Sequence, residues 1–474
     1  MNMATITAAS PGLADVREAV ASASVADRVV IPAGSAVWSG QLVVTKGVVI
    51  VGAGATETSI KSAYAGGSGW GDESFMVVYK PSNHLDPFRL SGIKWDCDER
   101  HGWLKINNMS ATAIPRRIRI DHNRVDNTAA FLFLLYGHAY GVMDGNDFND
   151  GYFRFLGANA SAWTNLSFEP GTADNWYIEG STIEQCPHYG MVMYAEGGAR
   201  YCIRDCEIGA SVGDFYPLMD AHGNQPNAHH ATMGVEIYRN RVSAGSLGGG
   251  LLDLRGGIGI VFENDIRSTG SIIPCKVREE YLDSGNAPAT GPTGQPQHVS
   301  GSYFWGNTKN GTTAIGAYTS GTVDYGGSVG LVPKEGRDYF QTQKPGYTPL
   351  EYPHPLTHDP DVGDGDEDDE EVTMKKTIPF SLEVTAAPGF FLGIDPATLA
   401  VAQGAVAVYN VMVTGAGGFV GPVTLAVLGL PPLVSASFSK PSVNVGEVSV
   451  LTLTVAAGAV MGTYQMEIEG TATV

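Results

Sequence analysis

The sequence predicts an all-β protein whose larger part is a β-solenoid, and two observations lead to this prediction. The first is a short template that occurs twice between Val235 and Ile266: an apolar residue, two variable residues, Asn, one variable residue and a second apolar residue. Ile237 to Val242 places Asn240 at the Asn position, and Ile260 to Ile266 places Asn264 there. The second observation is that the template recurs along the chain, which is typical of a repeat architecture.

The template recurs at a spacing that suits one coil of a solenoid. Further copies place Asn123, Asn146 and Asn307 at the same position, and weaker copies place Ser181 and Cys206 there. The successive separations are 23, 35, 25, 34, 24 and 43 residues. Three of the six lie at 23 to 25, and the others fit one such unit plus an insertion. A period in this range indicates a solenoid.

The residues of the repeated units favour strands over helices. The units are rich in Ile, Val, Phe and Tyr, alternate apolar with polar residues, and are interrupted by Gly and Asn. One unit cannot bury its apolar row alone, so stacking is needed to form a continuous core. We expect the recurring Asn to adopt the left-handed conformation of a tight turn and its amide to hydrogen-bond along the axis. The alternative is a β-sandwich in which the spacing arises by chance.

The N-terminal residues predict a short amphipathic helix that caps the solenoid. Ser10 is the expected N-cap and Pro11 the first helical residue, and apolar residues follow at helical spacing. We expect residues 1–24 to cover the open end of the solenoid, which otherwise exposes core and backbone edge.

The residues after this helix resemble a known group of folds. The order of VVIPAG (29–34), Trp38 and KGVVIVGAG (46–54) resembles the opening of right-handed parallel β-helix proteins. Many of these are polysaccharide lyases, glycoside hydrolases, phage tailspikes or uncharacterised repeat proteins. Five further segments resemble one uncharacterised β-helix family: His138–Phe148, Asp220–Gln225, Val235–Val242, Leu254–Ile266 and Gly336–Leu356.

This resemblance covers about residues 10 to 356 and implies a right-handed parallel β-helix over residues 25–358. It implies little about activity, because the chemistry of that family is not established and the fold hosts many functions.

An acidic run marks the end of the predicted solenoid. Nine of the thirteen residues from 359 to 371 are Asp or Glu, which repel one another and favour an extended linker, predicted over residues 359–377. Asp364, Asp366 and Asp368 are candidate Ca²⁺ ligands in this run, although the full EF-hand spacing is absent. The alternative is a solvated linker that binds no metal.

Residues 378–474 predict an Ig-like β-sandwich. Short alternating strands are expected at Phe380–Val384, Val406–Val413, Val423–Val427, Ser449–Val455 and Tyr464–Ile468. The segments GGFVGPVTLAV (417–427), ASFS (436–439) and LTLTVAAGAVMGTYQMEIEGTA (451–472) resemble Ig-like modules appended to bacterial extracellular and phage virion proteins. Tyr464 is a candidate tyrosine-corner residue, and because this part holds no Cys, its core must depend on apolar packing.

Composition excludes several classes of protein. The net charge of −20 argues against nucleic acid as a partner, since phosphate binding needs clustered Lys and Arg. The five Cys include no CxxC pair, so we expect buried thiols instead of a disulfide framework or a zinc site. No apolar run reaches the length of a membrane span, so membrane insertion is not expected. The N-terminus has neither the basic nor the apolar region of a signal peptide.

The densest polar cluster supplies the candidate catalytic residues. The cluster consists of Asp220, His222, His229 and His230, with Asp253 and Arg255 one predicted coil later, and stacked coils lie about 4.8 Å apart. Asp220, His222 and Arg255 are therefore expected to face one groove. A polysaccharide lyase needs an activated base, and a glycosidase needs two carboxyl groups about 5 to 9.5 Å apart. The alternative is structural: Asp220 and His222 fix a turn, and Arg255 pairs with a stacked acid.

Several aromatic residues lie in predicted insertions or at strand ends, namely Trp163, Trp176, Tyr189, Tyr194, Phe215 and Tyr216. If exposed along one face, they form a platform for sugar rings; otherwise they fill the inserted loops.

These patterns lead to one leading hypothesis and two alternatives. The leading hypothesis is a structural and adhesive protein on a virion or extracellular surface, such as a phage fibre, spike or decoration protein. Its partners would be cell-surface or extracellular polysaccharide and other virion or surface proteins, with no cofactor other than a Ca²⁺ ion. The first alternative is a polysaccharide lyase or glycoside hydrolase that acts on an acidic polysaccharide. The second is a secreted adhesin whose signal peptide has been removed.

Overall fold

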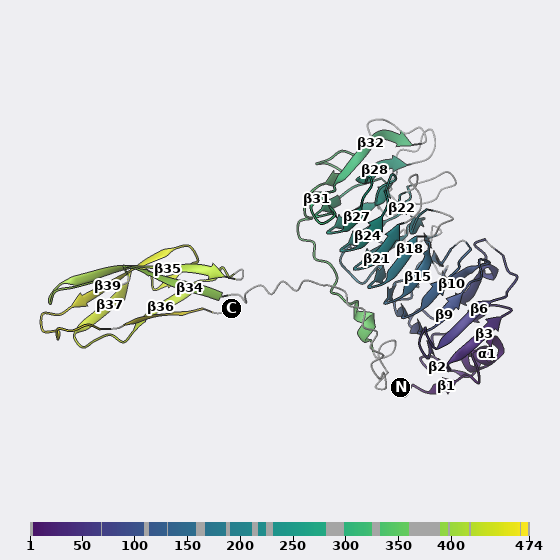
Figure 1. Ribbon diagram of the computed structural model, residues 1–474, viewed down its shortest axis with the longest axis horizontal. Helices are drawn as coiled ribbons and strands as arrows, with labels where there is room; N and C mark the ends of the chain where they lie inside the picture. The colour runs from purple at the N-terminus through teal and green to yellow at the C-terminus, as the bar shows by residue number, and fades with distance from the viewer. Residues whose placement is uncertain are drawn as a thin grey trace. The chain divides into compact units, whose positions relative to one another are not determined.

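The structure, a computed structural model, divides into two compact units, Met1–Asp369 and Glu370–Val474 (Figure 1). It describes residues 3–67, 69–108, 113–129, 131–157, 166–185, 190–210, 217–223, 231–280, 298–324, 332–359, 389–396, 399–416, 419–464 and 466–472. The boundary between the units falls inside the predicted linker. That linker, including Asp364, Asp366 and Asp368, lies outside the described residues, so both the linker and the Ca²⁺ site stay predictions.

The first unit is a solenoid of three long sheets, A, B and C, whose described strand pairings are parallel except for one antiparallel pairing at the end of sheet B (Figure 1). Sheet A contains β1 Thr5–Thr7, β2 Arg28–Ile31, β5 Val49–Gly52, β8 Phe88–Ser91, β11 Ile118–Asp121, β14 Gly141–Asp144, β17 Trp176–Glu179, β20 Arg200–Arg204, β23 Gly234–Tyr238, β26 Ile258–Phe262, β29 Ser302–Trp305 and β33 Tyr339–Phe340. Sheet B contains β3 Gly34–Trp38, β6 Thr58–Ser62, β9 Lys94–Asp96, β12 Arg124–Asp126, β15 Asp147–Gly151, β18 Thr182–Gln185, β21 Glu207–Ala210, β24 Arg241–Ala244, β27 Asp265–Ser268, β30 Thr308–Lys309 and β31 Thr313–Ala314. Sheet C contains β4 Leu42–Val44, β7 Phe75–Tyr79, β10 Gly102–Asn108, β13 Phe133–Gly137, β16 Phe153–Leu156, β19 Met193–Glu196, β22 Met219–Ala221, β25 Leu252–Leu254, β28 Cys275–Glu280 and β32 Ala317–Asp324.

Each coil contributes one strand to A, then to B, then to C, so like residues stack on like. The predicted solenoid is confirmed by columns of buried side chains that follow the strand register. One column in sheet A, at most 1% exposed throughout, consists of Ile50, Leu90, Ile120, Met143, Ile178, Ile203, Ile237, Val261 and Phe304. The largest core cluster of this unit extends from Ala8 to Tyr339.

The predicted N-terminal helix exists, but it begins later than expected. Helix α1 spans Leu13–Ser22 with Gly12 as its N-cap, and it packs Val16, Ala19 and Val20 against the solenoid core. The Ser10 hydroxyl accepts a hydrogen bond from the Gly12 amide, so it stabilises a turn before the helix instead of capping it. A strand, β1, precedes the helix and was not predicted.

The recurring Asn residues form one continuous column at the turn from sheet A to sheet B, as predicted. The Asn240 amide groups, backbone and side chain, donate to Asn264 Oδ1 at 3.1 and 2.9 Å, and those of Asn264 donate to Asn307 Oδ1 at 3.1 and 2.8 Å. Asn123 bonds Asn146 in the same way, at 3.0 and 3.2 Å. Ser181 and Cys206 continue the column between these two groups: Asn146 N donates to Ser181 Oγ, and Cys206 N donates to Asn240 Oδ1.

The conformation expected for the Asn residues was wrong. The left-handed residue is the one before each column position, with φ between 53° and 64°: His122, Gly145, Gly180, Asp205, Arg239, Glu263 and Gly306. This residue makes the bend. The Asn that follows directs its buried amide between two coils, where it bonds both its neighbour and backbone carbonyl groups.

The four described cysteines, Cys97, Cys202, Cys206 and Cys275, are buried free thiols, as predicted. The described part of this unit contains the short 3-10 helices η1 Asp72–Ser74 and η3 Pro355–His358. Among the helices of the described residues, none is long and apolar enough to cross a membrane.

After the last parallel strand, β33, the chain turns back over the outer face of sheet A. We name residues 341–359 the strap, because they form no further coil. Tyr347 packs against Phe262 and Trp305, with ring centroids 5.8 and 6.1 Å away. Further along, the backbone of Glu351 accepts from Arg204 at 2.8 Å, and Asp359 accepts from Arg117 at 2.9 Å. The strap thus crosses from the C-terminal coils back to β11.

The strap encloses ionic groups that would otherwise be buried without enough partners. The Glu179–Arg204 ion pair is at most 1% exposed, and the backbone amide of His354 donates to Glu179 at 2.7 Å. Glu236, 0% exposed, accepts from Tyr347, Asn175 and the Gly171 amide. Burial is the largest influence on the pKa of Glu236 and raises it to about 6.

The second unit is a small antiparallel sandwich-like region. One sheet contains β34 Gly389–Asp395, β35 Val406–Ala416, β39 Val448–Val455 and β37 Val434–Phe438; the other contains β38 Ser442–Val443, β36 Val423–Leu428 and β40 Glu467–Thr471. The predicted strands at β35, β36 and β39 are confirmed. The last strand begins at Glu467 instead of Tyr464, and the expected strand Phe380–Val384 lies outside the described residues. The core is apolar, as expected, and includes Val411, Val413 and Leu451.

We predict that Asn264→Ala lowers the free energy of unfolding of the first unit by about 3 kcal/mol, because it removes several buried hydrogen bonds and leaves their partners unsatisfied. All seven Trp residues belong to this unit, so the urea midpoint followed by Trp fluorescence reports on it. Glu263→Gly, the adjacent control, is expected to be neutral or to stabilise by about 1 kcal/mol, because glycine relieves the left-handed strain. Equal losses in the two variants would contradict the roles assigned to the two positions.

We also predict that Glu236 makes the first unit less stable as pH rises. Its folded pKa of about 6 exceeds the ordinary value of 4.5, so its contribution is fully present below pH 4.5 and is lost as pH rises through 6. The free energy of unfolding of the first unit should therefore fall by about 2 kcal/mol between pH 4.5 and a pH well above 6. Glu236→Gln should abolish this part of the pH dependence when urea midpoints at pH 4.5 and 7.5 are compared with wild type. An unchanged pH dependence in the variant would show that the carboxyl group is not responsible.

Candidate functional site

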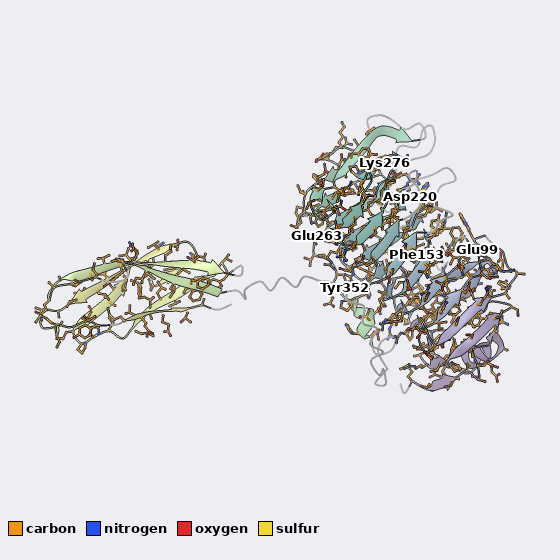
Figure 2. All side chains as sticks on the ribbon, in the orientation of Figure 1. Glu99, Phe153, Asp220, Glu263, Lys276 and Tyr352 are labelled. Atoms are coloured by element: carbon orange, nitrogen blue, oxygen red, sulfur yellow. The ribbon has the colours of Figure 1, made fainter. Side chains whose placement is uncertain are left out.

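The predicted catalytic residues lie together on the outer face of sheet C. Asp220 on β22 is in register with Tyr194 on β19 and with Asp253 on β25, and Asp253 is in register with Lys276 on β28. Asp220 and Lys276, two coils apart, lie along the same side of the solenoid (Figure 2). The expectation that Asp220 and Arg255 come from successive coils agrees with this register.

Arg255 binds Asp220 through two parallel hydrogen bonds. Arg255 Nε donates to Asp220 Oδ1 at 2.9 Å, and its terminal nitrogen donates to Oδ2. The two side chains are 10% and 5% exposed. Burial is the largest influence on the pKa of Asp220 and raises it, while Arg255 and His222 act in the opposite direction. This is the ion pair that the structural alternative expects, and the catalytic assignment stays a prediction.

His222 is fixed beside this pair. Its backbone amide donates to the Ala195 carbonyl and its own carbonyl accepts from the Thr232 amide, both at 2.9 Å. Its ring lies 4.9 Å from the ring of Tyr194, and the residue is 4% exposed. The structure thus places Asp220, His222 and Arg255 in one buried cluster, while His229 and His230 lie outside the described residues.

The Asp220–Arg255 geometry is repeated along sheet C. Asp253 pairs with Arg278 at 2.7 to 3.2 Å, and Arg154 pairs with Glu196 at 2.7 Å. In each pair, the first residue is in register with a residue on the next strand, and its partner lies two residues after that register neighbour. The contact is therefore diagonal between adjacent strands. Sequence reasoning missed Arg278 and Glu196. The signal was present, since each lies one coil plus two residues away from its partner.

Aromatic side chains accompany these ion pairs. The guanidinium group of Arg154 lies 4.4 Å from the ring of Trp70 and 4.1 Å from that of Tyr194. Trp70 is 44% exposed, and Tyr318, in register with Lys276, is 36% exposed.

The aromatic residues that the sequence predicts as a platform for sugar rings lie in different environments. Tyr194 lies on this face, half-buried, whereas Trp176 is fully buried in the core between Phe133 and Phe155 and cannot belong to a platform. The remaining four, Trp163, Tyr189, Phe215 and Tyr216, lie outside the described residues.

The insertions of the chain border sheet C. From β8 onward, the connection from sheet A to sheet B always has two residues. Over the same coils, up to β29, connections from B to C have 1 to 8 residues and connections from C to A have 3 to 21. The insertions inferred from the longer template separations are therefore confirmed, and they lie on both sides of one face. In repeat proteins such a face often carries the binding function.

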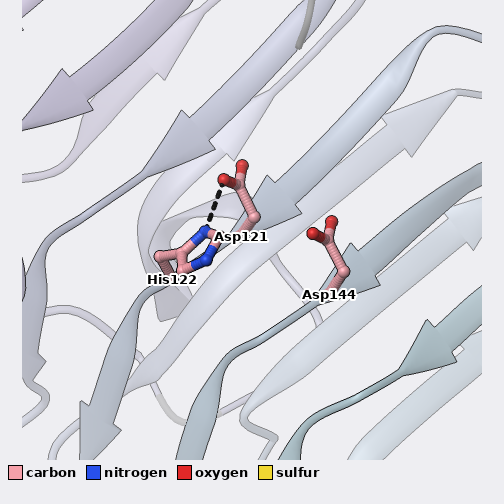
Figure 3. Close-up of side chains that lie close together, drawn as sticks. All are labelled: Asp121, His122 and Asp144. Carbon is pink, nitrogen blue, oxygen red and sulfur yellow. Dashed lines mark hydrogen bonds and ion pairs between the residues drawn. The ribbon is translucent and has the colours of Figure 1, made fainter. Parts of the chain in front are cut away.

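Among the described residues, Asp121, His122 and Asp144 have ligand atoms close enough to hold a metal ion, within 4.8 Å of one another (Figure 3). Both carboxylates are already bound by arginine: Asp121 by Arg89 at 2.7 and 2.8 Å, and Asp144 by Arg119 at 3.0 and 3.1 Å. Two adjacent guanidinium groups oppose the binding of a cation. The donor set therefore fits an ion-pair network better than a metal centre.

Comparisons of the chain with protein-family models, with curated proteins and with solved structures found no match.

We predict that Asp220→Ala lowers the free energy of unfolding by about 3 to 5 kcal/mol, because it leaves the Arg255 charge buried without its carboxylate. The matched control is Glu207→Ala, which removes the partner of Arg241 from a pair at 2.8 Å that is 48% and 35% exposed. The control should cost less than about 1 kcal/mol. Urea unfolding followed by Trp fluorescence measures both, and a cost for Asp220→Ala no larger than for the control would disprove a structural role of the pair.

Proposed function

We propose that this chain is a structural and adhesive protein displayed on a virion or other extracellular surface, and that it binds polysaccharide along the outer face of sheet C. The observation that carries this proposal is the position of the insertions, which border sheet C and leave the turn from sheet A to sheet B constant. Loops placed on a rigid scaffold are where recognition usually resides.

The chemistry of sheet C supports a carbohydrate ligand. Exposed Trp70 and Tyr318 offer ring faces, which pack against the apolar faces of sugar rings. The flanking pairs Arg154–Glu196 and Asp253–Arg278 hold polar groups in fixed positions for hydroxyl groups. The buried columns and the Asn column support the structural part of the proposal, because they make a rigid support that needs no disulfide.

We further propose that the solenoid winds as a right-handed parallel β-helix and that the second unit is an Ig-like module. Connections between parallel strands of one sheet are right-handed in about 98% of cases. The described strands of the second unit form sheets of four and three strands, which is the division of an Ig constant-type sandwich. The Tyr464 hydroxyl donates to the Val460 carbonyl at 2.9 Å, as a tyrosine corner requires. A cryo-EM map at side-chain resolution tests both assignments.

A polysaccharide lyase or glycoside hydrolase at Asp220, His222 and Arg255 is the second candidate. It is favoured by the register of Asp220 with Asp253, which places two carboxyl-bearing residues on adjacent strands about 5 Å apart. Arg255 would have to leave Asp220 before it could act as a base, which counts against this candidate. Activity on an acidic polysaccharide that Arg255→Ala abolishes in a folded protein would favour the enzyme.

We predict that Trp70→Ala and Tyr318→Ala each weaken polysaccharide binding about 10-fold, because truncating an aromatic anchor costs about 1.4 kcal/mol. Affinity electrophoresis against a panel of acidic and neutral polysaccharides measures the effect. Phe391→Ala in the second unit is the control, because this residue is 68% exposed but lies outside sheet C. Binding that survives both sheet C substitutions would refute the proposed surface.

Electron microscopy of purified particles tests whether the protein is displayed on a virion surface. Display is refuted if the protein is always found free.

A further inference from the structure

A second polar cleft lies on sheet A, between the strap and the ends of three strands. It has a volume of about 530 Å³ and is lined by side chains from β11, β14 and β17 on one side and from the strap on the other. The lining residues with charged or ionisable side chains are Arg119, His122, Asp144, Glu179, Tyr352 and His358. This cleft is distinct from the sheet C face described above.

The floor of the cleft consists of two glycines that bring His122 and Tyr352 close to each other. Gly145 and Gly180 occupy the left-handed position on successive coils. A Cβ atom at Gly145 would lie 3.4 Å from His122 Nε2, and one at Gly180 would lie 3.0 Å from the Tyr352 hydroxyl oxygen. Because adjacent strands are about 5 Å apart, the imidazole and the phenol are separated by about one strand spacing.

The imidazole of His122 is held by a buried carboxylate. Its Nδ1 lies 2.9 Å from Asp121 Oδ2 (Figure 3), and Asp121 is 0% exposed. Arg89 and Ser91 fix this carboxylate at 2.7 to 2.9 Å. The His122 side chain is 63% exposed. A carboxylate that accepts from Nδ1–H selects the tautomer whose Nε2 is free to accept a proton, as in an orienting Asp–His pair.

The carboxylates of the cleft are not available for acid chemistry. Asp144 is bound by Arg119 through two hydrogen bonds, and Glu179 is bound by Arg204. Hydrolysis by a pair of free carboxyl groups therefore does not suit this cleft. An imidazole base opposite a phenol suits a different reaction, the removal of a carbon-bound proton with departure of a neighbouring oxygen.

We propose that this cleft cleaves uronate-containing polysaccharide by β-elimination, with His122 as the general base and Tyr352 as the general acid. His122 Nε2 takes the proton from C5, and the electron pair of the C5–H bond forms the C4–C5 double bond. The C4–O bond breaks, and the leaving oxygen takes the proton of the Tyr352 hydroxyl. The imidazolium then returns its proton to the phenolate through water. No oxidant or other co-reactant is needed.

The uronate requirement follows from the chemistry. A sugar C–H bond is acidic enough only beside a carbonyl group, and in a uronate the C6 carboxylate supplies it. The developing negative charge on that carboxylate needs a positive neighbour, which the guanidinium group of Arg119 supplies from the sheet A side of the cleft. Burial raises the pKa of Tyr352, which keeps the phenol protonated and able to donate.

The reaction should speed up with rising pH. His122 must be neutral to act as a base. The hydrogen bond to Asp121 raises the pKa of His122 above 6.5, Asp144 adds to this effect, and Arg119 opposes it. His358 and Tyr352 face the same cleft from the strap, and Glu179 faces it from β17. The rate should therefore increase through a pKa above that of an ordinary histidine.

Absorbance at 235 nm, the signature of the unsaturated product, tests the proposal on polygalacturonate, alginate and hyaluronan with the full chain. We expect the wild-type chain to form unsaturated product from at least one of these polymers. The substitution His122→Asn should lower the rate of this reaction about 100-fold or more. Asn suits this position, because it tolerates the left-handed backbone. Tyr352→Phe should lower kcat similarly with little change in KM, since the ring remains. The matched control His84→Gln, an exposed histidine outside the cleft, should leave the rate unchanged.

Thermal melting of each variant shows that it is folded. The proposal is overturned if no polymer yields unsaturated ends, if folded His122→Asn keeps the wild-type rate, or if the new ends are saturated. It is also overturned if Arg255→Ala abolishes the activity while His122→Asn does not, because the reaction then belongs to sheet C. Loss of polysaccharide binding at Trp70 and Tyr318 leaves this test unaffected, because those residues lie on the other face.

Discussion

The structure of the first unit depends on one constraint: every coil must present the same turn from sheet A to sheet B to the coil above it. The buried Asn column enforces this, because each side-chain amide group donates to the Asn side chain of the next coil and to a backbone carbonyl group of the previous coil, and each side-chain oxygen accepts from the backbone amide of the previous coil. A turn of any other length would displace the amide and leave buried donors unsatisfied, at about 1 to 3 kcal/mol each. Variation in chain length is therefore confined to the two borders of sheet C.

The strap also supplies hydrogen-bond partners to buried polar groups, in this case at the outer surface of sheet A. That surface carries charged side chains such as Arg119 on β11, Glu179 on β17 and Arg204 on β20, and none of these side chains is exposed beyond 4%. Buried ions are tolerable only with full hydrogen bonding, which the strap backbone completes at Leu350, Glu351 and Thr357. The strap, residues 341–359, is thus part of the fold of the first unit, although it belongs to no coil.

The two outer faces now suggest different functions. On sheet C, arginines and acids are locked in pairs with aromatic rings beside them, an arrangement suited to holding a ligand in place. On sheet A, the ion pairs lie beneath a cleft and leave the imidazole of His122 accessible above a buried carboxylate. On sheet C, the ion pairs occupy the carboxylate and guanidinium groups. On sheet A, the paired carboxylate of Asp121 orients the imidazole of His122.

The sequence by itself determined the parts that depend on local repetition. The Asn spacing predicted stacked coils, the long separations predicted insertions, and the alternating strands around Val406 and Ser449 predicted the second unit. Each follows from the period of a strand or a coil, which is visible along the chain. Asp220 and Arg255 were placed together for the same reason, since they are one coil apart.

Only the tertiary structure decided which residue bends the turn, where residues 341–359 go, and which side chains share the cleft on sheet A. Glu263 and His122 take the left-handed position because the following residue must face inward, which no propensity reveals. Tyr352 lines the same cleft as His122, which lies about 230 residues earlier in the sequence, because the strap runs against the direction of the coils. Contacts between distant segments leave no period in a single sequence, because they depend on the docking of one finished surface on another.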